Sequence, residues 1–352
     1  MENYKVLTLK DYQEWINALK SIPSKDSDFY YHPSYYNLYE KYGDGTACCF
    51  VFTFNNECAI YPFLINEINT LFPELNTKYY DIQGAYGYNG VISTSKDSNF
   101  INKFHLSFKE YINQNNIVAE FTRFHPILEN INFSKNYLDV FYDRTTVGVN
   151  LENKIEDIRS NYSKTVKKNL KVAKNNNLEV KILENNFEID LFIKIYQENM
   201  KRVSASKYLF FNNEYFNNLF SLQNCVQFIV YHNNTPIASS ICFYSKSFFH
   251  YHLASALTDY LKYCPNNILM DCQIEFAHKN KFKYIHLGGG LSSNDEDTLF
   301  KFKKGYSSDH FRFSTGKKIH NKKIYNKIIN LWESKNPEKK DYLKNILLKY
   351  RL

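Results

Sequence analysis

The stretch "YIHLGGGLSSNDEDTLFKFKKGYSS", residues 284–308, brings together three glycines, a run of acids and a group of lysines. The glycines match neither the dinucleotide fingerprint GxGxxG nor the phosphate loop GxxxxGK[ST], and acids follow where phosphate would have to lie. Phosphate binding is therefore disfavoured, and a structural role is favoured, in which glycine lets the chain leave a strand sharply. A close approach of the Gly289 backbone to a bound substrate is compatible with that role.

A short helix is expected after the acids, capped by Asp295 or Asp297 and with Leu299 and Phe302 facing inward. Its lysines then remain available to bind a negatively charged group (Lys301, Lys303 and Lys304). Lysines on a solvated helix face are the alternative.

The loop "DIQGAYGYNG", residues 81–90, combines Asp81 with three glycines and the tyrosines Tyr86 and Tyr88. Tyrosines on a glycine-shaped loop can stack on a sugar or hydrogen-bond to a polar acceptor. Because the chain has 30 tyrosines, ordinary packing is the alternative.

The segment "EFTRFHP", residues 120–126, has the alternation of a strand that ends at a proline. Arg123 can clamp a phosphate or carboxylate, or it can be a structural bridge between domains. His125 titrates near neutral pH.

A second strand with chemical potential is "FFHYHLASA", residues 248–256, in which His250 and His252 share one face and Tyr251 lies on the other. Tyr251 or His252 can line a reaction site, and His252 has the intrinsic pKa best suited to a general base. A buried, hydrogen-bonded strand histidine is the alternative for His252.

Length and composition predict a globular chain of about two domains, because it has 352 residues, 44% of them hydrophobic and 17% aromatic. We expect a cytoplasmic protein, since neither an 18-residue apolar stretch nor a signal peptide occurs. Seven cysteines without a CxxC pair favour neither a disulfide framework nor a metal site. The formal charge of +8 is spread over 44 basic and 36 acidic groups and suits an anionic partner only weakly.

The elements that must position these residues follow one plan twice. A helix over 8–20 precedes a hairpin over 46–68 that turns at Asn55-Asn56. Three antiparallel strands over 225–256 follow the same hairpin logic, with the first turn at Asn233-Asn234-Thr235-Pro236. Pro265 then begins a helix that leads to the strand "KYIHLGG", a crossover that favours parallel pairing.

We expect a basic helix over 154–174 between the halves, with the domain boundary just before it, near residue 147. The expected organisation is an N-terminal domain (1–147), a second domain (148–321) and a tail (322–352) of two short amphipathic helices separated at Asn336-Pro337.

The order of five motifs resembles the FemABX-type acyl and aminoacyl transferases of the GNAT superfamily, over roughly residues 25 to 320. The motifs are "YGYNG" (86–90), "RFHP" (123–126), the basic helix, "LGGG" (287–290) and "FKKGY" (302–306). The resemblance implies an α/β (α+β) fold of tandem GNAT-like domains, each a mixed, mainly antiparallel sheet flanked by helices. It also implies transfer of an activated acyl or aminoacyl group to an amine or hydroxyl, often on a cell-envelope or capsule polysaccharide precursor.

Several residues acquire roles by this resemblance. Lys303 is implied as the cation that stabilises the oxyanion or the donor phosphate, and Phe302 as a wall of the pocket. Tyr86 and Tyr88 are implied in acceptor binding, and Arg202 and Tyr208 lie where relatives place an arginine and a tyrosine near the acceptor. Val91 departs from the proline usual after the last glycine of that loop.

The donor implied is acyl-CoA or aminoacyl-tRNA, with no permanently bound cofactor. The acceptor implied is a small-molecule, lipid-linked or nucleotide-linked sugar or a peptide. The segment "TDYLKYCPNN", residues 258–267, lacks the glycines of the usual coenzyme A pyrophosphate loop, which puts ordinary acetyl-CoA use in doubt. Since the nucleophile motif GxSxG is absent as well, direct transfer without a covalent enzyme intermediate is the simpler chemistry.

Two other function classes stay open from the sequence. One is a non-catalytic nucleic-acid-binding protein in which the basic helix contacts phosphates. The other is an interaction protein on an inactive transferase scaffold.

Overall fold

The computed structural model describes residues 3–203, 205 and 207–352, and its chain divides into two compact units. Unit 1 comprises residues up to Asp143 together with Phe313–Leu352, and unit 2 comprises Arg144–Arg312. No helix among the described residues has both the length and the apolar character needed to cross a bilayer.

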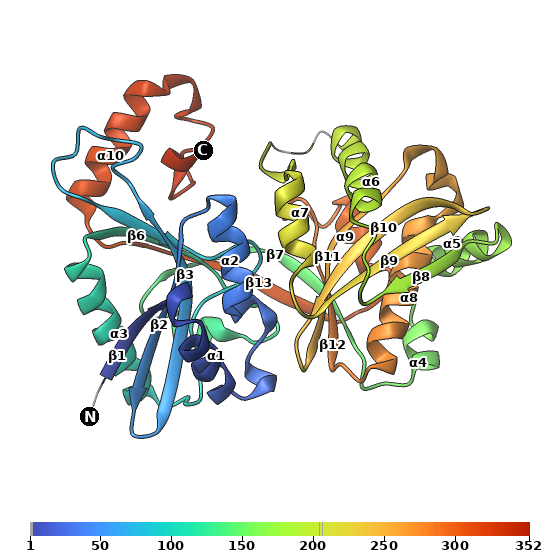
Figure 1. Cartoon of the computed structure of the whole chain (residues 1–352), viewed down its shortest axis with the longest axis horizontal. Coiled ribbons are helices and arrows are strands. Elements are labelled where there is room, and N and C mark those ends of the chain that lie inside the picture. Colours follow the sequence, from blue (N-terminus) through green and yellow to red (C-terminus); the bar gives the residue numbers. More distant parts are fainter. Residues whose placement is uncertain (1–2, 204, 206) are drawn as a thin grey trace. The chain divides into compact units, whose positions relative to one another are not determined.

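The sheet of unit 1 follows the order β1-β2-β3-β4-β6-β13, with the short β5 paired to β3 (Figure 1). Its strands are β1 (Asn3–Thr8), β2 (Thr46–Phe54), β3 (Glu57–Glu67), β4 (Tyr80–Gln83), β5 (Ile92–Ser93), β6 (Ile117–Arg123) and β13 (His310–Ile319, in this unit from residue 313). Its helices are α1 (Tyr12–Ser21), α2 (Pro33–Tyr42), α3 (Ser98–Gln114) and α10 (Lys322–Lys335), with 3-10 turns η1 (Leu9–Asp11), η2 (Ser24–Asp26), η3 (Phe29–Tyr31), η4 (Asn130–Phe133), η7 (Pro337–Lys339) and η8 (Lys349–Arg351).

The sheet of unit 2 follows the order β8-β9-β10-β11-β12-β7. Its strands are β7 (Asp139–Asn150, in this unit from residue 144), β8 (Glu179–Leu183), β9 (Cys225–His232), β10 (Thr235–Tyr244), β11 (Phe248–Ala256) and β12 (Tyr284–Gly289). Its helices are α4 (Ile155–Ser160), α5 (Lys164–Asn175), α6 (Ile189–Arg202), α7 (Asn213–Phe220), α8 (Pro265–Lys279) and α9 (Thr298–Lys304), with η5 (Lys207–Leu209) and η6 (Thr258–Tyr263).

The two sheets have the same succession of pairings, which confirms the expected tandem fold. In each, three antiparallel pairs are followed by one parallel pair and a last antiparallel pair. The parallel pairs are β4 with β6, joined through α3, and β11 with β12, joined through α8. A helix between two strands is the connection that parallel pairing requires.

The sixth strand of each sheet is exchanged between the repeats. Along the chain β7 follows β6, yet it pairs with β12, whereas β13 follows β12 and pairs with β6. The segment 322–352 accordingly packs into unit 1, where its apolar side chains share a core with residues of the 68–75 loop and of β6.

Local signals explain most element boundaries. The hairpin turns lie at Asn55-Asn56 and Asn233-Asn234, as expected, and all four asparagines adopt the positive φ that this turn type requires. The expected continuous helix over 154–174 is wrong, because Ser163 caps a new helix by accepting a hydrogen bond from the Val166 amide at 3.2 Å. The second tail helix is also wrong: turns and η8 follow η7 there.

Candidate active site

Helix α9 is positioned by Asp297, one of the two expected caps. One carboxylate oxygen accepts hydrogen bonds from the amides of Leu299 and Phe300 at 2.9 and 3.0 Å. The other accepts from the amides of Leu291 and Ser292 at 3.0 and 3.1 Å. Burial opposes ionisation, but these amide donors hold the pKa of Asp297 below its usual value. The acid after the glycines therefore fastens the loop to the helix.

Replacing Asp297 by alanine is expected to lower the free energy of unfolding of unit 2 by about 1–2 kcal/mol, because the cap and two loop contacts are lost together. Since the pKa of the carboxyl is lowered in the folded state, its contribution is present above the ordinary carboxyl pKa and disappears as pH falls through the folded value. Urea unfolding at pH 7 and at acidic pH measures both effects. Asp295→Ala, an exposed acid two residues earlier, is the matched control, and an equal loss in that variant would contradict the capping role.

The inward face of α9 differs from the expectation, since Phe300 and Lys303 are buried and Lys301 and Lys304 are exposed. Asp297 sets the phase of this short helix, and residues three apart then share a face. Lys303 is only 6% exposed, so it does not belong to a solvated lysine face.

The Lys303 ammonium lies against the glycine corner. Its Nζ donates a hydrogen bond to the carbonyl of Gly289 at 2.7 Å and lies 5.5 Å from the ring centre of Tyr251. Gly288 has a φ of +77°, which favours glycine, and a Cβ there would lie 3.3 Å from the Lys303 Nζ. The absence of a side chain at position 288 therefore leaves space for the ammonium. Burial lowers the pKa of Lys303 to about 7, with Asp297 opposing and Arg144 assisting. The amine therefore exchanges its proton near neutral pH.

These residues meet where the parallel pair of unit 2 ends. β11 and β12 pair only over Phe248–His250 with Tyr284–His286, and Tyr251 and Gly289 lie beyond the last pair. Backbone groups past that point are released from the ladder between these two strands, where Lys303 supplies a cation. In unit 1 the loop with Tyr86 and Tyr88 likewise follows β4, the first strand of the parallel pair.

His252 lies on the face of β11 opposite Tyr251, with its ring 4.9 Å from that of Phe243. Burial, assisted by His250, lowers the pKa of His252 to about 3. The near-neutral pKa that favoured His252 as a general base is therefore not retained, because burial penalises the charged ring.

The other predicted residues of unit 2 lie in three places. Phe302 is half-buried, with its ring 5.5 Å from Tyr306. Arg202, at the end of α6, is exposed and donates to Asn199 Oδ1 at 2.6 Å. Tyr208 is 40% exposed, with its ring 5.8 Å from Phe211. Of these, Phe302 lies on α9 with Lys303. Arg202 lies at the end of α6, and Tyr208 lies between α6 and α7.

In unit 1 the tyrosine loop packs on an aromatic cluster. The carbonyl of Tyr86 accepts a hydrogen bond from the Tyr35 hydroxyl at 2.6 Å, and the Tyr88 ring lies 5.2 Å from those of Tyr30 and His125. Gly87 between them has φ +96°, and a Cβ there would lie 2.4 Å from the Tyr30 ring. Both tyrosines are half-buried, and these contacts pack the loop on the aromatic cluster.

Arg123 is tied to the same loop. Its Nη1 donates to the Gly84 carbonyl at 3.2 Å, and its amide donates to the Asn89 side chain at 2.8 Å. Its guanidinium lies 4.9 Å from the ring centre of Phe121. The arginine therefore connects β6 with the tyrosine loop inside unit 1.

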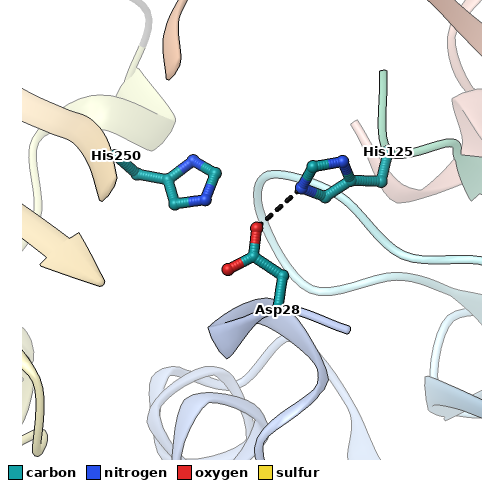
Figure 2. A group of neighbouring side chains, drawn as sticks. All are labelled: Asp28, His125 and His250. Atoms are coloured by element: carbon teal, nitrogen blue, oxygen red, sulfur yellow. Dashed lines mark hydrogen bonds and ion pairs between the residues drawn. The ribbon is translucent and has the colours of Figure 1, made fainter. Parts of the chain in front are cut away.

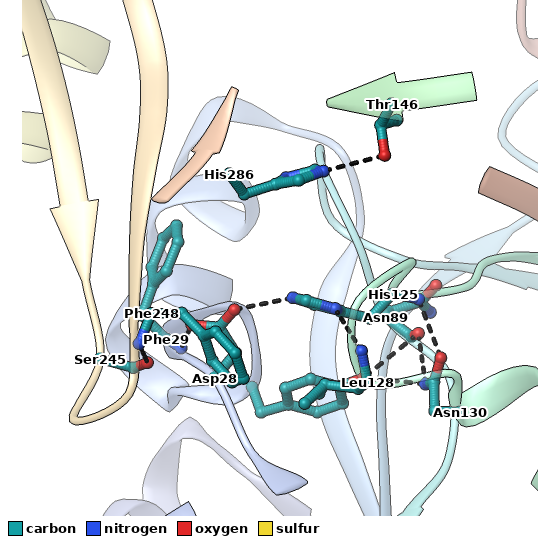
Figure 3. Close-up of polar contacts among 11 residues, drawn as sticks. Asp28, Phe29, Asn89, His125, Leu128, Asn130, Thr146, Ser245, Phe248 and His286 are labelled. Atoms are coloured by element: carbon teal, nitrogen blue, oxygen red, sulfur yellow. Dashed lines mark hydrogen bonds and ion pairs between the residues drawn. The ribbon is translucent and has the colours of Figure 1, made fainter. Parts of the chain in front are cut away.

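A buried pair that sequence reasoning missed lies beside this loop. His125 Nε2 donates to Asp28 Oδ2 at 2.7 Å, shown in Figure 2, and both side chains are fully buried. The Leu128 amide donates to His125 Nδ1 at 3.2 Å, which places the ring proton on Nε2. Figure 3 shows the surrounding bonds of Asn89 and Asn130 and, in unit 2, the bond between His286 and Thr146. Because Asp28 and His125 are 97 residues apart, no local spacing announces the pair.

Asp81 has a different environment from the tyrosines. Its carboxylate accepts from the Tyr350 hydroxyl at 2.9 Å and from Arg351 Nε at 2.8 Å, and the side chain is fully buried. Burial raises the pKa of Asp81, while Arg351 opposes the rise. The acid thus holds the C-terminal segment to β4.

Comparison with known proteins agrees with this architecture. Residues 159–304 match the family model of the acetyltransferase (GNAT) domain, and Tyr251, Gly289, Phe302 and Lys303 fall inside that range. No protein of curated function matches the sequence.

Solved structures share the fold along most of the chain. FemX has a TM-score of 0.69 at 13% identity, covering 93% of this chain and 99% of its own. The C-terminal domain (DUF2156) of a putative lysylphosphatidylglycerol synthetase from Agrobacterium fabrum has 0.55 at 11%, covering 93% and 96%. L-PGS from Bacillus licheniformis has 0.50 at 12%, covering 77% and 84%. The family match and the FemX fold confirm the resemblance expected from the sequence.

Proposed function

We propose, from this GNAT-type fold, that the chain transfers an activated acyl or aminoacyl group directly to an amine or hydroxyl of a cell-envelope or capsule polysaccharide precursor in the cytoplasm. The donor is acyl-CoA or aminoacyl-tRNA. The observation that carries the proposal is Lys303, a buried cation held on the Gly289 carbonyl where the β11–β12 pairing ends.

The reaction needs no covalent enzyme intermediate. The acceptor nitrogen or oxygen attacks the donor carbonyl carbon, the C–O or C–S bond to tRNA or CoA breaks, and the acceptor proton passes to the leaving group. Negative charge develops on the carbonyl oxygen, and an ammonium shielded from water stabilises it more strongly than an exposed one. Lys303 has that role in the proposal, and the side chains of Phe302 and Tyr251 pack against the donor carbonyl.

We assign binding of the acceptor to residues of both units, and this role is inferred for each of them. Tyr86 and Tyr88 present half-buried rings that suit stacking on a sugar. Arg123, Arg202 and Tyr208 remain predicted acceptor contacts. Asp81 is proposed to act only by positioning the loop, since its carboxylate binds Arg351.

The test supplies purified protein with either an acyl-CoA mixture or charged tRNA, each with a panel of amino sugars and nucleotide sugars. Mass gain of one acceptor with loss of one donor identifies the reaction. Lys304→Met, which removes an exposed lysine next to the site, is expected to keep the activity. If neither donor is consumed and neither raises the melting temperature, the enzymatic proposal is wrong and a binding role takes its place.

A further inference from the structure

The net charge of this chain is concentrated near its C-terminal end. Residues 317–352 contain eleven lysines or arginines and three acids, a balance of +8 that equals the formal charge of all 352 residues. The basic residues are Lys317, Lys318, Lys322, Lys323, Lys327, Lys335, Lys339, Lys340, Lys344, Lys349 and Arg351. The rest of the chain has equal numbers of basic and acidic groups, so this segment accounts for the net positive charge.

Only part of this charge is neutralised by neighbours. Lys335 pairs with Glu74, Lys340 and Lys349 pair with Glu333, and Arg351 pairs with Asp81. Four other lysines are exposed and have no carboxylate partner among residues 3–203, 205 and 207–352 (Lys322, Lys323, Lys327 and Lys344). Lys323 and Lys327 line one open hollow on α10, together with Asn326, Asn330 and Leu331.

Large apolar side chains are exposed in the same segment. Tyr342 is 88% exposed and Ile346 is 42% exposed, whereas the residues directly after them, Leu343 and Leu347, are buried. The two leucines belong to the core that the segment shares with the 68–75 loop, so the fold turns Tyr342 and Ile346 outward. Lys317 Nζ donates to the Asn345 carbonyl at 3.1 Å and fixes this turn next to the end of β13.

The segment is a built surface and not a loose tail. Ile328 and Trp332 of α10 are buried in that core, and Figure 1 shows α10 and the turns after it beside the blue loop that follows β3. The exposed lysines and the outward tyrosine and isoleucine are therefore presented on a fixed support.

We propose that residues 317–352 are a docking surface for an anionic lipid bilayer. Lysines attract a surface of negative headgroups, while a tyrosine and an isoleucine exposed on the same segment can insert into the boundary between headgroups and acyl chains. A nucleic acid would bind the lysines through its phosphates but has no apolar region in which the exposed isoleucine could be buried. The exposed isoleucine therefore favours a bilayer over a nucleic acid. The proposal does not depend on the transferase function.

The test is sedimentation of the full chain with vesicles of two parts phosphatidylcholine to one part phosphatidylglycerol, and with pure phosphatidylcholine vesicles. We expect binding to the anionic vesicles only, weakened by roughly tenfold or more when NaCl is raised from about 0.1 M to about 0.5 M. Replacing Lys322, Lys323, Lys327 and Lys344 by glutamine is expected to lower the partition coefficient up to about a thousandfold. Tyr342→Ser with Ile346→Ser should lower it about tenfold and leave the salt dependence in place.

The matched control replaces four exposed lysines of α5 by glutamine, which removes the same charge elsewhere (Lys164, Lys168, Lys171 and Lys174). We expect it to retain vesicle binding within about threefold, and far-ultraviolet circular dichroism and urea unfolding confirm that each variant is folded. Equal losses in both lysine variants, or equal binding to both vesicle types, would overturn the proposal. Binding of a polyuridylate probe through the 317–352 lysines without any vesicle binding would replace it with a nucleic-acid surface.

Discussion

Replacing Lys303 by methionine is expected to lower kcat/KM by about 10²–10³-fold, the magnitude that follows loss of one donor to a developing oxyanion. The methionine side chain is nearly as long as that of lysine, so the buried face of α9 keeps its shape. The cation and its hydrogen bond to the Gly289 carbonyl are lost. Because burial lowers the pKa of Lys303 to about 7, the wild-type rate should fall as pH rises above that value. The variant's residual rate should not follow this profile.

The same substitution tests the buried charge through stability. The amine is protonated in the unfolded chain up to its ordinary pKa but only to about 7 in the folded chain. Between these values the unfolded state binds more protons, so wild-type stability should rise with pH relative to Lys303→Met, by up to about 1.4 kcal/mol per pH unit. Urea unfolding at several pH values measures the difference.

Two outcomes would contradict a cationic Lys303. A wild-type rate that rises through pH 7 would mean that the neutral amine acts, as a base would. A Lys304→Met variant that loses as much activity as Lys303→Met would mean that the site needs general positive charge and not this ammonium.

Periodicity and turn chemistry account for most of the fold. The Asn55-Asn56 and Asn233-Asn234 turns set both hairpins, and Pro265 begins α8, because each signal acts within a few residues. The exchange of β7 and β13 has no such local signal. It depends on which sheet edge each strand pairs with, namely β12 for β7 and β6 for β13. The sequence of either strand is compatible with either edge.

The candidate site shows the same division. The lysines of α9 were identifiable as a group, but which of them turns inward depends on where the helix begins, and Asp295 and Asp297 were equally good caps from the sequence. Asp297 caps, and this choice buries Lys303. The pairing of Asp28 with His125 arises from tertiary contacts, which no spacing along the chain encodes. The sequence left His252 open as a general base or as a buried strand histidine, and only the tertiary contacts decide that desolvation lowers the pKa of its ring.

Replacing Arg351 by methionine is expected to destabilise unit 1 by about 3–5 kcal/mol, because it leaves the fully buried Asp81 carboxylate without its ion partner. Burial already raises the pKa of Asp81 in the presence of Arg351, and removal of the guanidinium should raise it further. For an acid whose pKa is raised in the folded state, the folded chain binds more protons than the unfolded chain between the two pKa values. The free energy of unfolding is therefore highest below the ordinary pKa of the acid and falls as pH rises through the folded value. The deficit of the variant should therefore be largest at neutral pH and shrink on acidification.

Urea unfolding at neutral and mildly acidic pH measures this deficit, and the double variant Asp81→Asn with Arg351→Met separates charge from packing. An amide at position 81 can still accept from Tyr350 and carries no charge, so the double variant should recover most of the loss. If it is as unstable as the single variant, the contribution of Arg351 is packing and not charge.

Because Asp81 lies on β4, immediately before the loop of Tyr86 and Tyr88, the single variant Arg351→Met should also raise the KM for the acceptor more than it lowers kcat. A fall confined to kcat would separate the C-terminal ion pair from acceptor binding.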